Sequence, residues 1–161
     1  MTSCAVVIIT FNEEVNLPYA LESVRDWTDE IFVIDSFSTD RTVEIAKAYG
    51  AKVVQRTFVS FSNQKNWAID NLDSECRWVL FLDADEYLSE EMKTEIKSVL
   101  RNDGGSVSGY FTRIKFIYLG RWLKHGDLYR NLIRLIRKDR GRYIETSGFR
   151  EKMIVEGSIL T

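Results

Sequence analysis

The sequence has few of the residues from which metal and nucleophile sites are commonly built. Its 161 residues include two cysteines, one histidine and one proline. Cys4 and Cys76 are too few for a disulfide framework and too isolated for a zinc site, so we predict two buried thiols in a reducing cytoplasm. His125 lacks an evident set of partner ligands and is predicted to be structural or exposed. No Ser/His/Asp or Cys/His nucleophile set is evident.

Long apolar runs and glycine-rich phosphate loops are also missing. No run approaches the roughly 18–20 apolar residues that cross a bilayer. The first residues, MTSCAVVIITFNEE, lack a basic region and a small-residue cleavage site, so they indicate a strand rather than a signal peptide. No GxGxxG follows this strand and no GxxxxGK(S/T) occurs, which removes the usual phosphate cradle of dinucleotide and P-loop proteins. A phosphorylated ligand would therefore need a metal to neutralise much of its charge.

The composition is that of one globular domain whose charge is unevenly distributed. Apolar residues make up 45% and charged residues 29% of the chain. Residues 1–112 contain 10 Lys and Arg against 19 Asp and Glu, whereas residues 113–152 contain 12 against 4. This asymmetry indicates either an anionic partner for the later half or an ordinary cationic surface.

The first hundred residues alternate apolar, β-branched runs with helical patterns. The pattern predicts that Ser89 caps a helix and that Gly50 follows the end of another. A strand–helix order of this kind predicts an α/β fold with a parallel sheet and right-handed crossovers. Strands are predicted at 4–10, 30–35, 51–56 and 77–83, and helices at 13–27, 40–50, 61–72 and 89–103, with Gly104 and Gly105 beyond the end of the last helix.

The pattern changes after Gly105. The stretch VSGYFTRIKFIYLGRWL has strand-like aromatic and β-branched content. The stretch YRNLIRLIRKDRGRY is ambiguous, because Arg130, Arg134 and Arg137 suit one helical face while IRLIR also suits a strand with a turn at 139–141. The chain ends at Thr161 inside an apolar stretch without a stop signal, which favours a truncated chain or a fragment.

Polar residues gather where the predicted parallel strands end. Ligands of open parallel sheets bind outside the carboxyl ends of the strands. Carboxylates at three of four such ends suit magnesium or manganese that also binds ligand phosphates. Simpler interpretations compete: Asp40 caps a helix, Asn12 and Glu13 start one, Asp83 and Asp85 are solvated, and Lys65 is a surface charge. The four ends are Thr10–Glu13, Asp35–Asp40, Arg56–Thr57 and Asp83–Asp85.

Four motifs in this order resemble the family 2 glycosyltransferases with the GT-A fold. They are VIITFNEE, IFVIDSFSTDRTVEIA, FSNQKNWAI and WVLFLDADE. Together with RLIRKDRGRY, they resemble the bacterial subgroup that adds sugars to the lipopolysaccharide core and related surface glycans. The resemblance implies one Rossmann-like GT-A domain over residues 1–161. Its mostly parallel sheet would belong to a nucleotide-sugar-binding half at 1–104, followed by a smaller mixed acceptor-side half at 105–161.

The resemblance also implies an inverting transfer from a nucleotide-diphosphate sugar, with a UDP-sugar favoured, to a glycan or glycolipid acceptor. Ser36 stands where the family often has a second acid after Asp35. The resemblance implies that Thr10, Glu13 and Asp35 lie near the nucleotide base and ribose, and that Lys65 approaches the base or the phosphates. It implies that Asp83 faces the ribose or a metal-bound water. Asp85 would bind the Mg²⁺ or Mn²⁺ that bridges the diphosphate.

Inversion needs a carboxylate base opposite the leaving group. The stretch SGFREKM matches a VHE-like motif of the subgroup, which implies Glu151 as the base with Arg150 in place of the histidine. Asp127 is the second choice. The alternative to an enzyme is a non-catalytic nucleotide-sugar-binding module. A sugar-nucleotidyltransferase is disfavoured because TFNEEVNLP contains no glycine-rich basic loop.

The basic segment gains a predicted partner from the same resemblance. We expect it to bind phosphates of a glycolipid acceptor, or the anionic inner face of the membrane, as part of a cytoplasmic and peripheral protein. Its residues are Arg130, Arg134, Arg137, Lys138, Arg140 and Arg142.

Overall fold

The computed structural model describes residues 3–73, 75–123, 131–146 and 150–161, without the side chain of Arg150. His125, Asp127 and Arg130 lie outside the described residues. The helices are α1 (Leu17–Val24), α2 (Thr42–Ala48), α3 (Phe61–Asn71) and α4 (Glu90–Arg101). The strands are β1 (Cys4–Thr10), β2 (Glu30–Asp35), β3 (Lys52–Gln55), β4 (Trp78–Asp83), β5 (Val107–Arg113), β6 (Ile117–Tyr118), β7 (Arg121–Trp122), β8 (Asn131–Arg137), β9 (Gly141–Thr146), β10 (Arg150–Val155) and β11 (Ser158–Leu160).

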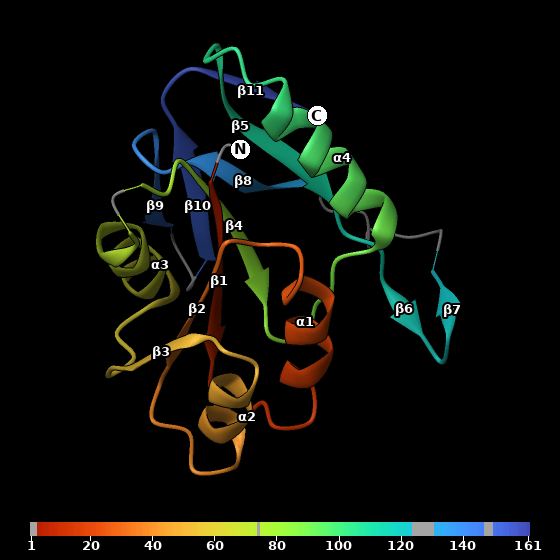
Figure 1. The fold of residues 1–161 in the computed structure, drawn as a ribbon. Coiled ribbons are helices and arrows are strands. Elements are labelled where there is room, and N and C mark those ends of the chain that lie inside the picture. Colours follow the sequence, from red (N-terminus) through yellow and green to blue (C-terminus); the bar gives the residue numbers. More distant parts are fainter. Residues whose placement is uncertain (1–2, 74, 124–130, 147–149) are drawn as a thin grey trace.

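The described residues form a seven-stranded sheet in the order β11-β5-β8-β4-β1-β2-β3 (Figure 1). Strands β1 to β4 run parallel, whereas β8 lies antiparallel between β4 and β5. Strands β9 and β10 form one small antiparallel sheet, and β6 and β7 form another. The predicted α/β fold, with a mostly parallel sheet and a smaller mixed portion, is confirmed.

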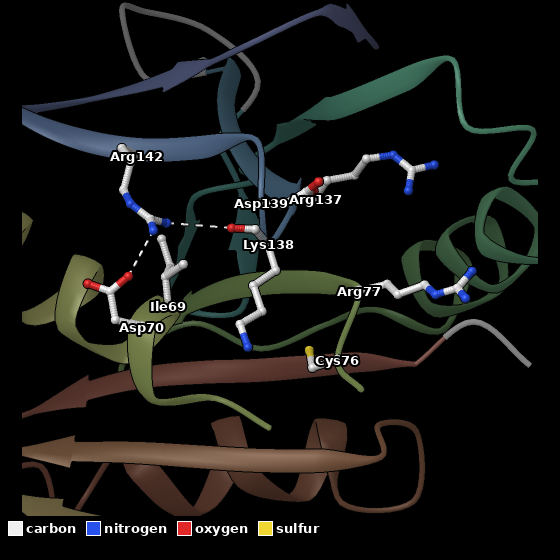
Figure 2. A pocket seen from close by; sticks show the side chains of 8 residues that line it. All are labelled: Ile69, Asp70, Cys76, Arg77, Arg137, Lys138, Asp139 and Arg142. Atoms are coloured by element: carbon white, nitrogen blue, oxygen red, sulfur yellow. Dashed lines mark hydrogen bonds and ion pairs between the residues drawn. The ribbon is translucent and has the colours of Figure 1, made fainter. Parts of the chain in front are cut away.

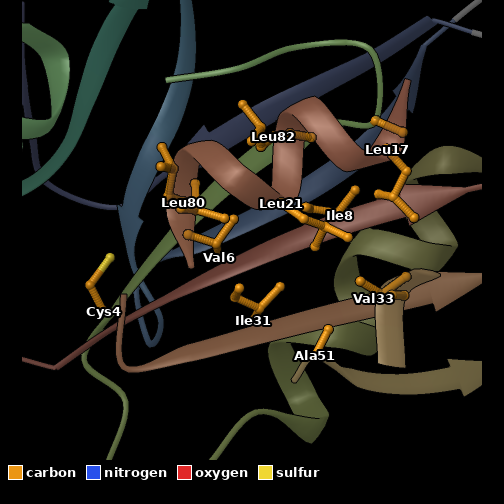
Figure 3. Close-up of a cluster of buried hydrophobic side chains, with 14 of the residues drawn as sticks. Cys4, Val6, Ile8, Leu17, Leu21, Ile31, Val33, Ala51, Leu80 and Leu82 are labelled. Carbon is orange, nitrogen blue, oxygen red and sulfur yellow. The ribbon is translucent and has the colours of Figure 1, made fainter. Parts of the chain in front are cut away.

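The sheet is buried on both faces, which explains the continuous apolar run of β1. Val6 and Ile8 point into a core that is closed by α1, α2 and α4 (Figure 3). Ala5 and Val7 point into a second core, closed by α3 and by Tyr143 of β9 with its neighbours. Because successive side chains of a strand face opposite sides, a strand between two helical layers has no polar side.

The four helices of the first hundred residues were predicted correctly, but some of their first and last residues differ from the prediction. Helix α1 begins at Leu17 rather than residue 13, with Pro18 in its first turn where a missing N–H costs little. Ser89 caps α4 by accepting a hydrogen bond from the Met92 N–H at 3.3 Å, as predicted. Gly50 follows α2 with φ 78°, also as predicted.

Asp40 does not occupy the capping position that the sequence suggested. Arg41 is the N-cap residue of α2. The Asp40 carboxylate instead accepts hydrogen bonds from the N–H of Thr42 at 3.0 Å and the N–H of Glu14 at 3.1 Å. It therefore joins the start of α2 to the loop after β1.

The ambiguous basic segment forms strands, so its helical interpretation is wrong. Leu135 and Ile136 of β8 are buried and pair with Leu80 and Val79 of β4. The turn before Gly141 then leads into β9. Both cysteines are buried and free, as predicted. No helix among the described residues is long and apolar enough to cross a bilayer.

Candidate functional site

The carboxyl ends of β1, β2 and β4 bring the predicted polar residues to one edge of the sheet. Thr10 pairs in register with Asp35, and Ile9 pairs with Asp83. These three strands are neighbours in the sheet, so Thr10, Asp35 and Asp83 lie across adjacent strand ends. The predicted convergence of carboxylates at a single edge is confirmed.

Asp35 is the centre of a buried hydrogen-bond network. Its side chain is inaccessible to solvent. The carboxylate accepts hydrogen bonds from the Thr10 hydroxyl at 3.2 Å, the Ser38 N–H at 2.9 Å and the Gln55 amide at 2.9 Å, and also from the Ser38 hydroxyl. A carboxylate with four donors holds three loops together and has little capacity left for a ligand.

The loops after β1 and β2 are joined by reciprocal hydrogen bonds. The Asn12 N–H donates to the Ser38 hydroxyl at 2.8 Å, and the Thr39 N–H donates to the Asn12 side-chain oxygen at 2.8 Å. Asn12 has φ 54°, a conformation that asparagine adopts more readily than most residues. The Glu13 N–H donates to the Thr42 hydroxyl at 2.8 Å. Glu13 is therefore held at the rim of the edge, half-buried.

Asp83 forms the core of a charged cluster at the end of β4. Arg134 of β8 donates to both of its carboxylate oxygens, at 3.0 and 2.6 Å, and also to Glu86 at 3.0 Å. The Asp83 N–H donates to the other oxygen of Glu86 at 3.1 Å. Arg134 is only 7% exposed. Its predicted place on a phosphate-binding cationic surface is therefore wrong.

Lys65 and Glu151 meet beside this cluster. Lys65 of α3 is 4% exposed, so the interpretation as a surface charge is wrong. Its ammonium group forms an ion pair with Glu151 of β10 and lies 4.0 Å from the Asp83 carboxylate. It also lies 4.7 Å from the ring centroid of Tyr143, which adds a cation–π contact. Three of the predicted site residues thus share one environment.

This environment shifts the pKa values of the neighbouring Asp83 and Glu86 carboxyl groups in opposite directions. Partial burial disfavours ionisation of Asp83, but the hydrogen bonds and charge of Arg134, together with Lys65, outweigh it and lower the pKa of Asp83. Burial raises the pKa of Glu86, and the negative charge of Asp83 adds to that rise. Burial also disfavours the charged form of Arg134, yet its two carboxylate partners raise its pKa. The cluster therefore keeps Arg134 charged.

Asp85 differs from these residues because its side chain is exposed. It forms no hydrogen bond or ion pair within the described ranges. No group of three potential metal ligands is found in the described part of the chain. One exposed carboxylate beside a half-exposed one fits a hard cation that draws its remaining ligands from waters and a diphosphate. Such a donor set fits Mg²⁺ or Mn²⁺ better than zinc.

Ser36 and Arg56 have local partners at the same edge. The Ser36 hydroxyl accepts from the buried Gln64 amide at 3.3 Å, in the place where a second acid was expected from the resemblance. Arg56 donates to the Asn63 side chain at 2.9 Å and stacks over Trp67, with 5.1 Å to the ring centroid. Sequence reasoning missed the roles of Glu86, Gln55 and Ser38. Only Glu86 carried a signal, because an acid three residues after Asp83 suits a turn.

A pocket of about 640 Å³ opens at the opposite edge of the sheet (Figure 2). It borders Cys76 and Arg77, which precede β4, so it lies far from the strand ends described above. Three of its cations already have partners: Arg142 binds Asp70 at 2.8 Å, Lys138 binds the Leu72 carbonyl at 2.9 Å, and Arg137 pairs with Asp103. The candidate site is therefore the carboxyl edge and not this pocket.

Comparison with known sequences identifies the family. The profile of the family described as "Glycosyl transferase family 2" matches residues 5–154. The chain belongs to glycosyl transferase family 2. An uncharacterized family relative, a glycosyltransferase of Rickettsia typhi, is 44% identical over 101 residues, which are 62% of this chain and 33% of that protein. The glycosyltransferase SunS of Bacillus subtilis is 39% identical over 97 residues, which are 58% of this chain and 22% of SunS.

The family assignment is matched by the fold. Staphylococcus aureus TarS 1–349 superposes with a TM-score of 0.62 at 23% identity, over 76% of this chain and 38% of that one. Glucosyl-3-phosphoglycerate synthase of Mycobacterium tuberculosis, solved with Mn²⁺, UDP-glucose and phosphoglyceric acid, gives 0.54 at 21% identity, over 67% and 42%. These likenesses show the GT-A fold. The chain spans about a third of the length of the Rickettsia relative, and the lipopolysaccharide-core subgroup stays a prediction.

Proposed function

We propose that this chain binds a nucleotide-diphosphate sugar, with a UDP-sugar favoured, and transfers the sugar with inversion to a glycan or glycolipid acceptor. The process served would be the synthesis of bacterial cell-surface polysaccharide or lipopolysaccharide. The observation that carries the proposal is the meeting of Lys65, Asp83 and Glu151 at the carboxyl edge of a family 2 domain. Open α/β sheets bind their ligands at this edge.

In this proposal Asp85 binds the divalent cation, Mg²⁺ or Mn²⁺. Asp85 is exposed at the strand end, whereas Asp83 is held by Arg134 and faces the ribose or a metal-bound water. When bound, such a cation stabilises the charge that develops on a diphosphate leaving group. Glu13 lies at the rim of the nucleotide side, where the buried Thr10 and Asp35 organise the loops around the base.

Glu151 is the proposed general base. Lys65 holds one of its carboxylate oxygens, while the other has no hydrogen-bond partner among the described residues. This second oxygen is buried and has an unused capacity to accept a hydrogen bond, and in the proposal an acceptor hydroxyl that reaches it gives up its proton there. The second candidate function, a non-catalytic nucleotide-sugar-binding module, draws support from the same ion pair, because Lys65 occupies the carboxylate that a base would use.

The acceptor side includes a proposed contact with an anionic membrane surface, for a cytoplasmic and peripheral protein. The β6–β7 hairpin supports this contact better than the basic segment does. Strand β5 runs parallel to β4, since both are antiparallel to β8, so the hairpin follows β5 at the edge that carries the site. It stands apart from the sheet in Figure 1. Leu119 at its tip is 84% exposed, and Arg113, Lys115 and Arg121 flank it in the sequence, with no acid in residues 113–121.

A thermal-shift panel tests the proposed donor binding. The protein would be heated with UDP, GDP, TDP or CDP, each with and without Mn²⁺. A ligand at about 100 times its Kd stabilises the native state by about 2.7 kcal/mol, so binding gives a clear rise in Tm. We expect the largest rise with UDP and Mn²⁺ together. No metal-dependent rise for any nucleotide would contradict both the enzyme and the binding module.

A further inference from the structure

Arg134 is the largest charged side chain buried at the candidate site, and the proposed function gives it no role beyond its contact with Asp83. It lies in β8, between β4 and β5, and is 7% exposed. Its two terminal nitrogens face the two oxygens of Asp83 at 3.0 and 2.6 Å. A paired fork of this kind fixes the rotation of a carboxylate as well as its position. Asp83 therefore presents one orientation at the edge of the sheet.

The same guanidinium braces the turn that carries Asp85. The Glu86 N–H donates to the Asp83 carbonyl at 3.0 Å, and the Asp83 N–H donates back to the Glu86 carboxylate at 3.1 Å. Arg134 then binds the remaining Glu86 oxygen at 3.0 Å. Asp85 lies inside this closed turn, without a partner of its own in the described ranges. Its position thus depends on a brace that it does not touch.

The charges explain why Arg134 holds this turn instead of binding a phosphate. Two carboxylates already neutralise its single positive charge. Releasing it to a ligand would leave Asp83 and Glu86 as neighbouring anions in a half-buried setting, which is costly. Without Arg134, repulsion between these two carboxylates would push the turn open and displace Asp85.

We infer that Arg134 is a positioning residue for donor binding: it locks Asp83, Glu86 and the intervening Asp85 into the arrangement that receives the cation and the diphosphate. This inference rests on the proposed function. A lysine at this position keeps the charge but loses the planar fork, so it is not a conservative replacement. Supporting residues behind metal ligands typically change metal affinity by about 10- to 100-fold when they are replaced.

Arg137 provides a matched control on the same strand. It also forms an ion pair with a half-buried residue, Asp103, but it lies opposite Trp78 at the other end of β4. Arg134→Lys and Arg137→Lys therefore disturb comparable ion pairs, and only the first is next to the proposed donor site. Urea unfolding of both variants would show whether their losses of stability are similar.

The experiment measures the Kd of UDP in the presence of Mn²⁺, and of Mn²⁺ at saturating UDP, by calorimetry. Arg134→Lys should weaken both by about 10- to 100-fold, and Arg137→Lys should leave both within about twofold, the scatter expected of a distant site. Because Arg134 acts through its carboxylate partners, Arg134→Lys should add little to Asp83→Asn in the double variant. If Arg134→Lys does not fold, Glu86→Gln should still weaken binding in the same direction, since it removes one of the two anchors.

The outcomes separate the inference from the function on which it rests. If the unaltered protein binds no nucleoside diphosphate, the proposed function fails and the role of Arg134 fails with it. If it binds UDP and Mn²⁺ but Arg134→Lys behaves like Arg137→Lys, only the positioning role is wrong. Multiplicative effects of Arg134→Lys and Asp83→Asn would also overturn it, because they would show that Arg134 acts independently of Asp83.

Discussion

Lys65 and Glu151 show at the scale of single residues what spacing along a chain leaves out. They are 86 residues apart and form a direct ion pair. Each was assigned to the site from its own motif, but nothing in either motif points to the other. Lys65 is only 4% exposed and needs an oppositely charged partner, since an unpaired buried charge is strongly unfavourable. Their pairing follows from how α3 packs on the β9–β10 sheet, which is a property of the fold.

Replacing Glu151 with glutamine tests its role as the base. Glutamine keeps the shape but cannot accept a proton, so transfer or donor hydrolysis should fall by at least about 100-fold. The affinity for UDP and Mn²⁺ should change little. The exposed Glu156, just beyond the end of β10, offers a control, and Glu156→Gln should leave the activity unchanged. A trace activity that survives Glu151→Gln would favour the binding module over the enzyme.

The opposite pKa shifts of Asp83 and Glu86 predict opposite effects of acid. The pKa of Asp83 is lowered on folding, so its contribution to stability is complete above about 3.9, the unfolded value, and is lost as pH falls through the folded value. The pKa of Glu86 is raised, so its ionised form costs stability, and that cost is relieved as pH falls toward about 4.3.

Urea unfolding across a pH series would measure both signs. The stability advantage of the unaltered protein over Asp83→Asn should stay constant above about pH 5 and shrink in stronger acid. Its advantage over Glu86→Gln should grow as pH falls through the range above about 4.3. If the stability difference from the unaltered protein changed with pH in the same direction for both variants, the pKa values of Asp83 and Glu86 would not be shifted in opposite directions.

At the scale of secondary-structure elements, local patterns predicted what is local. The four parallel strands were found because each is a short apolar run between helical patterns, and the carboxyl ends of such strands share one edge. The position of β8 could not be predicted, because its antiparallel pairing with β4 joins residues more than fifty positions apart. For the same reason Arg134 was assigned to a surface: the alternation in IRLIR does not reveal that both faces of its strand are covered.

The side chain of Asn66 ties helix α3 to β9, in addition to the Arg142–Asp70 ion pair, and this joint helps to bring Lys65 to Glu151. The Asn66 amide donates to the Tyr143 carbonyl at 2.8 Å and accepts from the Tyr143 N–H at 2.9 Å. Asn66→Ala should lower the free energy of unfolding by about 1–3 kcal/mol, because two backbone groups lose their partner. It should also lower the transfer activity, because the Lys65–Glu151 pair that holds the proposed base would loosen.

Asn71 gives the matched control in the same helix. Its amide donates to the Trp67 carbonyl at 2.8 Å, but the side chain is exposed and bridges to no other element in the described part of the chain. Asn71→Ala should therefore change the stability by less than about 0.5 kcal/mol, as is usual for surface positions. Equal losses for the two variants, measured by urea unfolding, would rule out a special role for the α3–β9 joint.

At the scale of the whole molecule, the structure separates the cations of 113–152 into those that pair with acids inside the protein and those that are exposed for external contact. Arg134 is inside the site, while Arg137 and Arg142 are engaged with acids of the earlier half. Three cations of 113–152 therefore pair with acids of residues 1–112. Composition alone could not separate this internal compensation from an anionic partner. The cations around the β6–β7 hairpin are the better candidates for external contact.

The proposed membrane contact predicts vesicle binding that depends on the tip of this hairpin. Leu119 is 84% exposed, so its side chain contributes little to the stability of the fold. Its φ of 48° is a backbone conformation that is unfavourable for leucine. Asparagine tolerates that conformation, and Leu119→Asn should therefore remove the apolar tip without harming the turn. Because burying a leucine is worth about 1.5–3 kcal/mol, vesicle affinity should fall by roughly tenfold or more.

Co-sedimentation with vesicles of neutral or anionic lipid would measure this binding. The unaltered protein should bind only the anionic vesicles, and high salt should weaken the binding because each cation near the surface contributes about 1 kcal/mol. Arg121→Gln should weaken it further, whereas Leu160→Asn, at an exposed leucine in β11, should not. Vesicle binding that does not change with salt would contradict a contact based on these cations. Vesicle binding that is unchanged in Leu119→Asn would show that the tip of the hairpin is not the contact. Such a result would leave the donor site intact, since the tip of the hairpin is separate from the Asp83 turn.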